Sequence, residues 1–445
     1  MKKLSRSEFV QVSIMLFGLF FGAGNLIFPP LLGNQAGTSL WPALFAFAIT
    51  AVLFPVLGAI VVGKTEGLSN LANRVGPKFS FVFTLAIYLS IGPGLGIPRA
   101  GSVPFEMAVA PYVPETFNLL AARLIYTFVF FSIALVISLK PSKLVARVGK
   151  FLTPSLLLLI TFMFFRLVSL PAQVAPAVGA YETNSLAQGF LAGYETMDAV
   201  AALNFGLVIA LAIRRFGVED KKEVTNYTIK AGLVAGALLL TVYAMLSFLG
   251  QRSSASLVGA ENGAVILTAA MRTALGSFGV ALLAAIFTLA CLTTCIGLIT
   301  SGGEYFYRLF NEKISYRTWV GIWTLFSFVF ANFGLNNLLA YSVPLLTLIY
   351  PVALLLIVLG ISHDLVNYPR LAYMSGAFAA VVLPLIGLLR SFNIYLPVLS
   401  NFEEGLLFSD MGLSWMVPSI ILVVFSTVLV KVFSKSRVTA SEEVL

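Results

Sequence analysis

Long apolar segments recur along the whole chain. Windows of roughly 20 residues, nearly free of charge, fall near residues 8–32, 40–63, 79–98, 119–139, 151–170, 186–213, 228–250, 279–300, 318–333, 337–360, 372–390 and 413–433. About 20 apolar residues are needed for a helix to cross a bilayer. A segment inside lipid must be helical, because no water is present to pair its backbone groups. The pattern therefore predicts an all-α polytopic membrane protein of about twelve transmembrane helices.

Composition excludes a water-facing domain. Charged residues make up 11% of the 445 residues, whereas a soluble domain carries about 25%. The net charge of +9 does not indicate nucleic acid, because the basic residues lie between apolar segments and form no cluster on one domain. We expect the lipid bilayer as the surroundings, no nucleic-acid partner and no obligate protein partner.

Basic residues predict the orientation of the chain. If the N-terminus is cytoplasmic, the inside segments hold 22 of the 28 Lys and Arg residues. Cytoplasmic loops of membrane proteins carry such an excess. The basic start MKKLSRSEFV is read as the beginning of an uncleaved first span, since no convincing cleavage site follows it. Both termini are predicted to be cytoplasmic, in the inner membrane of a bacterium.

The first apolar segment contains residues that interrupt a helix. Gly22, Gly24 and Asn25 adopt non-helical angles readily, and Pro29 and Pro30 remove two backbone donors. Helices in lipid are interrupted only where the backbone lines a cavity or is buried in protein. A second half-helix would offer free N–H groups to a carboxylate, and the carbonyls freed from the first half suit a cation. The alternative is close helix packing through small residues.

The sixth segment carries two acidic residues near its middle. Glu195 and Asp198 lie beside Gly193 and Thr196, which again tolerate an interruption. Ionised carboxylates inside a membrane are expensive and usually functional. Asp198 is expected either to cap a second half-helix or to face an ion or an ammonium group. Both residues are merely solvated if they lie near a membrane face.

Interruptions in the first and sixth segments are five segments apart. Transporters built from two five-helix units of inverted topology have their site where those first helices meet. The predicted repeats are 1–170 (helices 1–5) and 186–360 (helices 6–10), followed by accessory helices 11 and 12 in 372–433.

Two further segments carry polar groups. The eighth contains the adjacent Thr293 and Thr294, whose hydroxyls either complete an oxygen shell for a small cation or bond back to their own helix. The third contains Arg99 in a Gly- and Pro-rich stretch that is too irregular for plain helix and suits an outer gate. Whether Arg99 binds substrate or a nearby acid is left open by the sequence.

Enzymatic and channel functions lack support in the sequence. Cys291 and Cys295 lie one helical turn apart, and we read them as two small apolar residues that form no disulfide. The single histidine, His363, is expected in a cytoplasmic loop with no catalytic partner set. No metalloprotease, nucleophile-elbow or nucleotide-binding motif is present, and no organic cofactor is expected.

Three motifs together resemble the bacterial branched-chain amino acid:cation symporters. They are FGAGNLIFPP (21–30), GPGLGIPR (92–99) and GYETMDA (193–199), and the likeness extends over essentially the whole chain. The resemblance implies uptake of leucine, isoleucine and valine with sodium. It also implies the five-plus-five inverted-repeat fold of the amino acid–polyamine–organocation superfamily, with broken helices 1 and 6.

A more remote likeness, to the first and eighth helices of bacterial sodium:neurotransmitter-type transporters, implies the site residues. One sodium ion would lie between the first and eighth helices at Gly18, Phe21, Ala290, Thr293 and Thr294. A second sodium site is not expected, because 228–250 contains no Asn. The substrate carboxylate would meet the amides around Ala23, Gly24 and Asn25. Its ammonium group would face the freed carbonyls near Phe20–Phe21 on the first helix and Tyr194–Thr196 on the sixth. The implied substrate-binding residues are Phe20, Phe21, Gly22, Ala23, Gly24, Asn25, Tyr194, Glu195, Thr196 and Asp198.

Proton coupling through Glu195 or Asp198 is the main alternative to sodium, because a buried carboxyl can carry a proton. The hydroxyls of Thr293 and Thr294 favour sodium, since they bind cations without titrating. Each buried CH₂ of an aliphatic substrate contributes about 0.8 kcal/mol, and an apolar pocket separates leucine from valine by only about 1–3 kcal/mol. One site can therefore serve all three substrates. Their rank order, the stoichiometry and the oligomeric state are not encoded in any motif.

Overall fold

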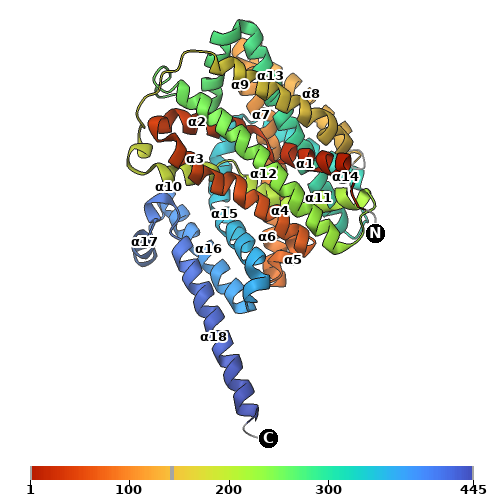
Figure 1. Cartoon of the computed structure of the whole chain (residues 1–445), viewed down its shortest axis with the longest axis vertical. Helices are drawn as coiled ribbons and strands as arrows, with labels where there is room; N and C mark the ends of the chain where they lie inside the picture. The colour runs from red at the N-terminus through yellow and green to blue at the C-terminus, as the bar shows by residue number, and fades with distance from the viewer. Residues whose placement is uncertain (1–2, 141–144, 443–445) are drawn as a thin grey trace. The chain divides into compact units, whose positions relative to one another are not determined.

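The computed structural model of the chain describes residues 3–140 and 145–442, and every regular element in these two ranges is a helix (Figure 1). Short 3₁₀ or π-helical turns interrupt or join the α-helices. The α-helices are α1 (Arg6–Phe20), α2 (Ala23–Ala36), α3 (Leu40–Ala48), α4 (Phe54–Thr65), α5 (Leu68–Ala72), α6 (Pro77–Leu89), α7 (Gly96–Ala108), α8 (Leu119–Ser138), α9 (Thr153–Val168), α10 (Ala180–Tyr194), α11 (Asp198–Arg215), α12 (Lys221–Arg252), α13 (Gly263–Leu309), α14 (Tyr316–Ala331), α15 (Leu335–Val366), α16 (Arg370–Ser391), α17 (Pro397–Glu404) and α18 (Met416–Glu442).

The helices have the length and composition of a multi-pass membrane protein. Within the described ranges nine segments are long and apolar enough to cross a bilayer, or ten when the bent pair α10 and α11 forms one span. Neither α1, with 15 residues, nor α14, with 16, reaches the full length of a span by itself. Pairing α1 with α2 leaves α3 and α4 as a span of their own, and this division together with α14 gives the twelve segments expected from the sequence. The exact number of spans stays a prediction.

The first predicted interruption is present at Phe21 and Gly22. Phe21 ends α1 with ψ of 90°, and Gly22 is extended with φ of −114° and ψ of −158°. Helix α2 then begins at Ala23 and includes Pro29 and Pro30. The break thus lies at the N-terminal edge of the stretch 22–25 in which the sequence placed it.

The second interruption separates α10 from α11 over residues 195–197. The two helices are bent by 43°. The turn depends on Met197, which adopts the left-handed conformation with φ of 67°. A non-glycine residue rarely takes this conformation. The break between α6 and α7 is also present, because Gly92 has non-helical angles within the π-helical turn Ser90–Gly94.

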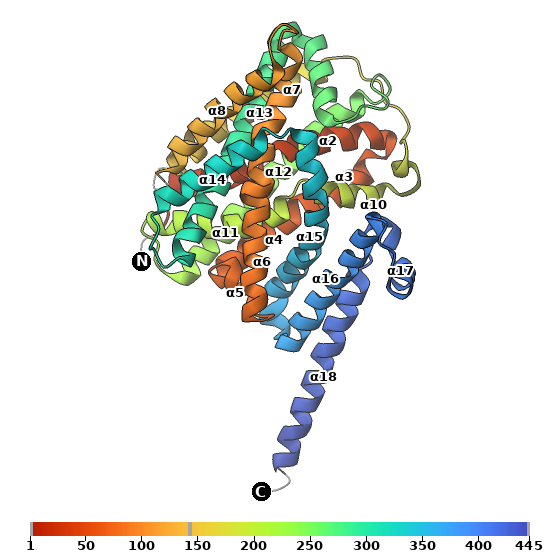
Figure 2. The same ribbon diagram turned by 180° about the vertical axis from the view of Figure 1, so that it is seen from behind.

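Small residues allow the broken helices to approach their neighbours closely. A Cβ added to Gly33 of α2 would overlap the Ser247 carbonyl of α12, and one added to Gly250 of α12 would overlap the Pro30 carbonyl. Figure 1 shows α2 and α12 side by side. Helix α7 packs on α13 and α14 (Figure 2). The turn Ser90–Gly94 before it also packs on α14, where Gly92 faces the ring of Trp323. These contacts pack α2 and the irregular turn before α7 closely against their neighbours.

The chain divides into two compact units. The first comprises Met1–Lys64 and Tyr88–Ser342, and it contains both interrupted helix pairs. The second comprises Thr65–Ile87 and Val343–Leu445. In this second unit α16 packs against α18, with Gly376 facing Val423. The predicted repeats 1–170 and 186–360 and the accessory helices in 372–433 concern internal symmetry, and they stay predictions.

Two minor expectations are decided by the structure. Cys291 and Cys295 are both buried and free, as expected. His363 was expected in a loop, but it lies in the last turn of α15. Its Nδ1 atom is 3.2 Å from the hydroxyl of Tyr373. The apolar run before it simply continues one turn further as helix.

Candidate functional site

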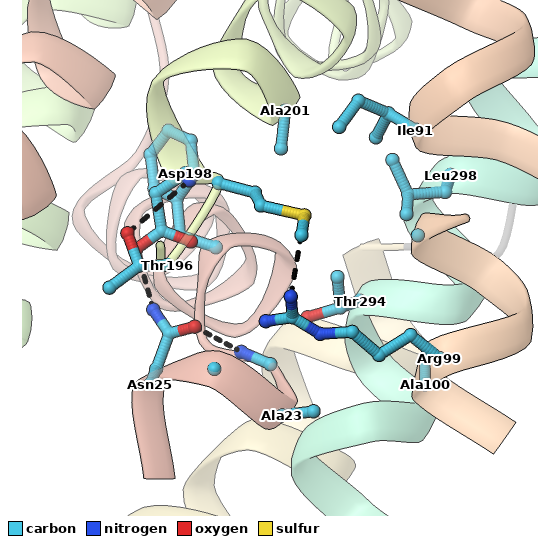
Figure 3. A pocket seen from close by; sticks show the side chains of 15 residues that line it. Ala23, Asn25, Ile91, Arg99, Ala100, Thr196, Asp198, Ala201, Thr294 and Leu298 are labelled. Atoms are coloured by element: carbon cyan, nitrogen blue, oxygen red, sulfur yellow. Dashed lines mark hydrogen bonds between the residues drawn. The ribbon is translucent and has the colours of Figure 1, made fainter. Parts of the chain in front are cut away.

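A small cavity lies where the two helix breaks meet α7 and α13. Its volume is about 50 Å³, enough for a few water molecules at about 10–15 Å³ each on the same measure. Asn25, Thr196 and Asp198 lie on one side of it, whereas Ile91 and Leu298 lie on the opposite side (Figure 3). One side of the cavity is therefore polar and the other aliphatic.

The polar side is organised around the Asp198 carboxylate. Its Oδ2 atom accepts a hydrogen bond from Asn25 Nδ2 at 2.6 Å and another from the Tyr243 hydroxyl at 2.7 Å. Asn25 Nδ2 and the Tyr243 hydroxyl also contact each other directly. Asp198 is the first residue of α11, where the helix dipole favours a negative charge. Groups from α2, α11 and α12 thus hold this buried carboxylate in one place.

The backbone around the polar side is tied by short-range bonds. The Asp198 N–H donates to Thr196 Oγ1 at 3.4 Å, and Thr196 Oγ1 donates to the Gly193 carbonyl at 2.9 Å. The Gly22 N–H donates to Asn25 Oδ1 at 3.3 Å. Asn25 and Thr196 are both buried. Each break is therefore held by a side chain that follows or lies within it.

Arg99 brings a buried positive charge into the same cavity. The residue is 7% exposed and extends from α7 toward the break between α10 and α11 (Figure 3). Its Nη1 and Nη2 atoms donate only long bonds of 3.5 Å, to Met197 Sδ and to the Glu195 carbonyl. The guanidinium also lies 5.9 Å from the ring centroid of Phe28. It forms no ion pair with any carboxylate in the described part of the chain.

Two buried hydroxyls beside α1 and its break have no hydrogen-bond partner in the described ranges. Thr294 Oγ1 faces Gly22, where an added Cβ would lie 3.0 Å from it. Thr153 Oγ1 at the start of α9 lies directly against Gly18. Thr293 differs from both, because its hydroxyl donates to the Ala290 carbonyl at 2.8 Å. The hydroxyl of Thr293 thus bonds within its own helix, whereas the hydroxyl of Thr294 has no acceptor or donor in the described ranges.

The cavity collects most, but not all, of the residues expected in the substrate site. Those that line it are Phe20, Gly22, Ala23, Gly24, Asn25, Thr196 and Asp198, together with Thr294 from the expected cation site. Phe21 is buried beside it and stacks on Phe17 and Tyr243. Tyr194 packs on Phe190, and the side chain of Glu195 is exposed. Glu195 contributes only its backbone carbonyl, which accepts the long hydrogen bond from Arg99.

Sequence reasoning missed two members of the cluster. Tyr243 lies in the middle of α12, and its reach to Asp198 spans 45 residues of chain. The signal for it was a tyrosine within an otherwise apolar span, since a buried tyrosine hydroxyl usually finds a partner. Met197 supplies both the turn and a sulfur contact to Arg99, and no local signal distinguishes it from a packing methionine.

Residues 5–433 match the family model described as branched-chain amino acid transport protein. The chain belongs to this family. It is accordingly a membrane transporter and not an enzyme. The chain is 39% identical to the branched-chain amino acid transport system 2 carrier protein of Pseudomonas aeruginosa, over 98% of this chain and 99% of that protein. It is 38% identical to the branched-chain amino acid permease BraB of Bacillus subtilis, over 96% of each.

Solved structures show that the family fold is shared with more distant transporters. Mhp1, a nucleobase-cation-symport-1 family transporter in a closed conformation with bromovinylhydantoin bound, has a TM-score of 0.63 at 14% identity. That likeness covers 96% of this chain and 93% of Mhp1. A manganese transporter of Eremococcus coleocola, solved as a point mutant, has a TM-score of 0.54 at 14% identity, over 96% of this chain and 94% of that one. These likenesses concern the fold alone.

Proposed function

We propose that the protein is a secondary active symporter that imports leucine, isoleucine and valine together with sodium by alternating access. The observation that carries this proposal is the two-sided cavity at the helix breaks, polar at Asn25 and Asp198 and aliphatic at Ile91 and Leu298. A branched-chain amino acid has the same division between a polar head and an aliphatic side chain. Named relatives at 38–39% identity, described as branched-chain amino acid carriers or permeases, support the substrate class.

The substrate's ammonium group is assigned to the polar side of the cavity. The Asp198 carboxylate and the carbonyls freed at the two breaks are acceptors for its three protons. The substrate carboxylate is assigned to the start of α2, because the first N–H groups of a helix have no carbonyl acceptor within that helix. The side chain then lies against the aliphatic wall, where every buried CH₂ contributes about 0.8 kcal/mol.

Sodium is assigned to the oxygen-rich region between α1 and α13. Sodium is a small hard cation that prefers oxygen ligands, and Thr294 Oγ1 is a buried oxygen without a hydrogen-bond partner that faces the break at Gly22. The carbonyls of Gly18, Phe21 and Ala290 and the hydroxyl of Thr293 complete the proposed set. Thr153 Oγ1 against Gly18 is a further oxygen that we add to it. No cluster of three His, Cys, Asp or Glu side chains suited to a metal occurs in the described ranges.

Proton coupling is the second candidate, and the burial of Asp198 favours it. This carboxylate is 3% exposed, lies in the cavity and receives two hydrogen bonds. A carboxylate in such a place can bind a proton with the substrate and release it on the other side. Glu195 is a weaker candidate for this role, because its side chain is exposed and does not line the cavity.

The finer architecture belongs to the same proposal. Twelve spans, two inverted repeats with broken helices 1 and 6, and two accessory helices would place the site at the interface of the repeats. The protein would lie in the bacterial cytoplasmic membrane with both termini inside.

Uptake of radiolabelled leucine into proteoliposomes tests the proposal. We expect accumulation with an imposed sodium gradient, competition by isoleucine and valine, and no competition by lysine or glutamate. Accumulation with a proton gradient alone would transfer the coupling role to Asp198 or Glu195. Size-exclusion chromatography would show that the protein is folded. If folded protein takes up no leucine under either gradient, the proposed substrate is overturned.

A further inference from the structure

Two side chains of opposite charge line the cavity without forming an ion pair with each other. Asp198 is 3% exposed and Arg99 is 7% exposed, yet no ion pair joins them. The carboxylate already has two donors, Asn25 and Tyr243, on its Oδ2 atom. The guanidinium has five N–H donors, of which two make bonds of 3.5 Å to neutral acceptors. A buried charge without a counter-charge is strongly unfavourable, so Arg99 favours a ligand that carries a negative charge.

The position of Arg99 relative to α2 leads to the same conclusion. A Cβ added to Gly24 would lie 2.6 Å from Arg99 Nη2, so the guanidinium lies directly against the first turn of α2. The N-terminus of a helix carries a partial positive charge and favours anions. Two positive groups therefore face the same small volume. An anion that contacts both groups would be stabilised by both.

Arg123 shows what a partnered arginine looks like in the same unit. Its Nη2 atom lies 2.7 Å from Glu106 Oε1, and the side chain is 17% exposed. Arg99 is more deeply buried than Arg123 and lacks such a carboxylate. The contrast indicates that the counter-charge of Arg99 is supplied from outside the chain.

We infer that the carboxylate of the transported amino acid is bound jointly by the Arg99 guanidinium and the first N–H groups of α2. The inference rests on the proposed function, because it assigns one end of the proposed substrate. A guanidinium binds a carboxylate through two parallel hydrogen bonds, and Asp198 faces the ammonium group at the other end of the polar side. The zwitterion thus supplies the negative charge that Arg99 lacks and a positive charge for Asp198. Arg99 is in this view a substrate-binding residue that selects α-amino acids over amines.

Binding of leucine and leucinamide to purified protein tests the inference by calorimetric titration in sodium. Leucinamide keeps the side chain and the ammonium group but replaces the carboxylate by a neutral amide. We expect wild-type protein to bind leucine at least about tenfold more tightly, since hydrogen bonds to charged groups contribute about tenfold or more in affinity. In Arg99→Gln the affinity for leucine should fall by about tenfold or more. The affinity for leucinamide should change by less than about threefold, so the preference disappears.

Two variants and the ligand pair keep the outcomes separate. Arg123→Gln, the matched control, should keep the wild-type preference for leucine. Arg99→Lys keeps a point charge without the planar fork, and its preference should lie between those of wild type and Arg99→Gln. Equal binding of leucine and leucinamide by wild-type protein would overturn the inference even if no Arg99 variant folds. Loss of both ligands to the same extent in Arg99→Gln would also overturn it. This is the result expected if Arg99 binds a small inorganic anion in place of the substrate carboxylate, because loss of that anion affects both ligands equally. Wild-type protein that binds neither ligand refutes the proposed function instead.

Discussion

Thr294 offers the sharpest test of the cation site, because its hydroxyl is buried without a hydrogen-bond partner beside the break in the first helix pair. Thr294→Val keeps the shape of the side chain and removes only this hydroxyl. An unsatisfied buried polar group costs about 1–3 kcal/mol. Without sodium, the variant should therefore be more stable than wild type by about that amount.

Sodium should reverse this order. A ligand that binds only the folded protein stabilises it by about 2.7 kcal/mol at a concentration one hundred times its dissociation constant. Wild-type protein should gain this stability, and Thr294→Val should gain little of it because one ligand of the ion is missing. The variant is then the more stable protein in potassium and the less stable one in saturating sodium.

The assay is thermal unfolding in detergent, in sodium chloride and in potassium chloride of equal ionic strength. The four tryptophans of the chain supply the fluorescence signal. Thr228→Val is the matched control, because Thr228 is fully buried in α12 and its hydroxyl donates to the Val224 carbonyl at 2.9 Å. The control should keep the wild-type shift between the two salts. A wild-type sodium shift in Thr294→Val would refute the assignment, whatever its stability in potassium.

Three further predictions concern the polar cluster and the helix crossing. Asp198→Asn should abolish concentrative leucine uptake, whereas Glu195→Gln, an exposed position outside the cavity, should keep it within about twofold by initial-rate uptake at equal expression. Tyr243→Phe removes one of the two donors to Asp198 Oδ2, so the melting temperature should fall by the equivalent of about 1.5–3 kcal/mol; an unchanged melting temperature would mean that the bond contributes nothing. Gly250→Ala places a Cβ on the α2 backbone and should destabilise the fold by about 1–3 kcal/mol or more, whereas Gly321→Ala, which meets nothing within 4 Å, should be neutral or slightly stabilising in the same melting assay.

Much of the architecture is encoded locally, and for that reason it could be predicted. The break at Gly22 depends on residues that lie next to it, and the backbone there follows their preferences. The same is true of the irregular stretch before α7, where Gly92 and Pro93 disrupt the helix. Apolar length gives the helices themselves, since the bilayer permits no other backbone structure there.

The details of the site depend on contacts between distant segments. The Asn25 amide and the Asp198 carboxylate are 173 residues apart in the chain, and Tyr243 joins them from a third helix. Sequence reasoning placed both Glu195 and Asp198 in the substrate site because both are acidic and adjacent to one break. Their orientations differ because the left-handed Met197 lies between them, so that one carboxylate turns inward and the other outward. A backbone angle imposed by packing has no signature in the residue itself.

The helix breaks and the pair of separated charges together explain how a membrane interior can recognise a zwitterion. Broken helices expose backbone carbonyls and N–H groups inside the protein, where water would otherwise have to supply them. These groups are neutral dipoles and suit either sign of charge. Asp198 and Arg99 add full charges at two ends of the cavity, and their separation fixes which end of the substrate goes where. An amine would leave Arg99 without a counter-charge, and a simple carboxylic acid would leave Asp198 without one. Only a molecule that carries both charges gives each of the two side chains a counter-charge. In the proposed binding mode the selection for amino acids therefore comes from charge, and the selection for branched aliphatic side chains comes from Ile91 and Leu298.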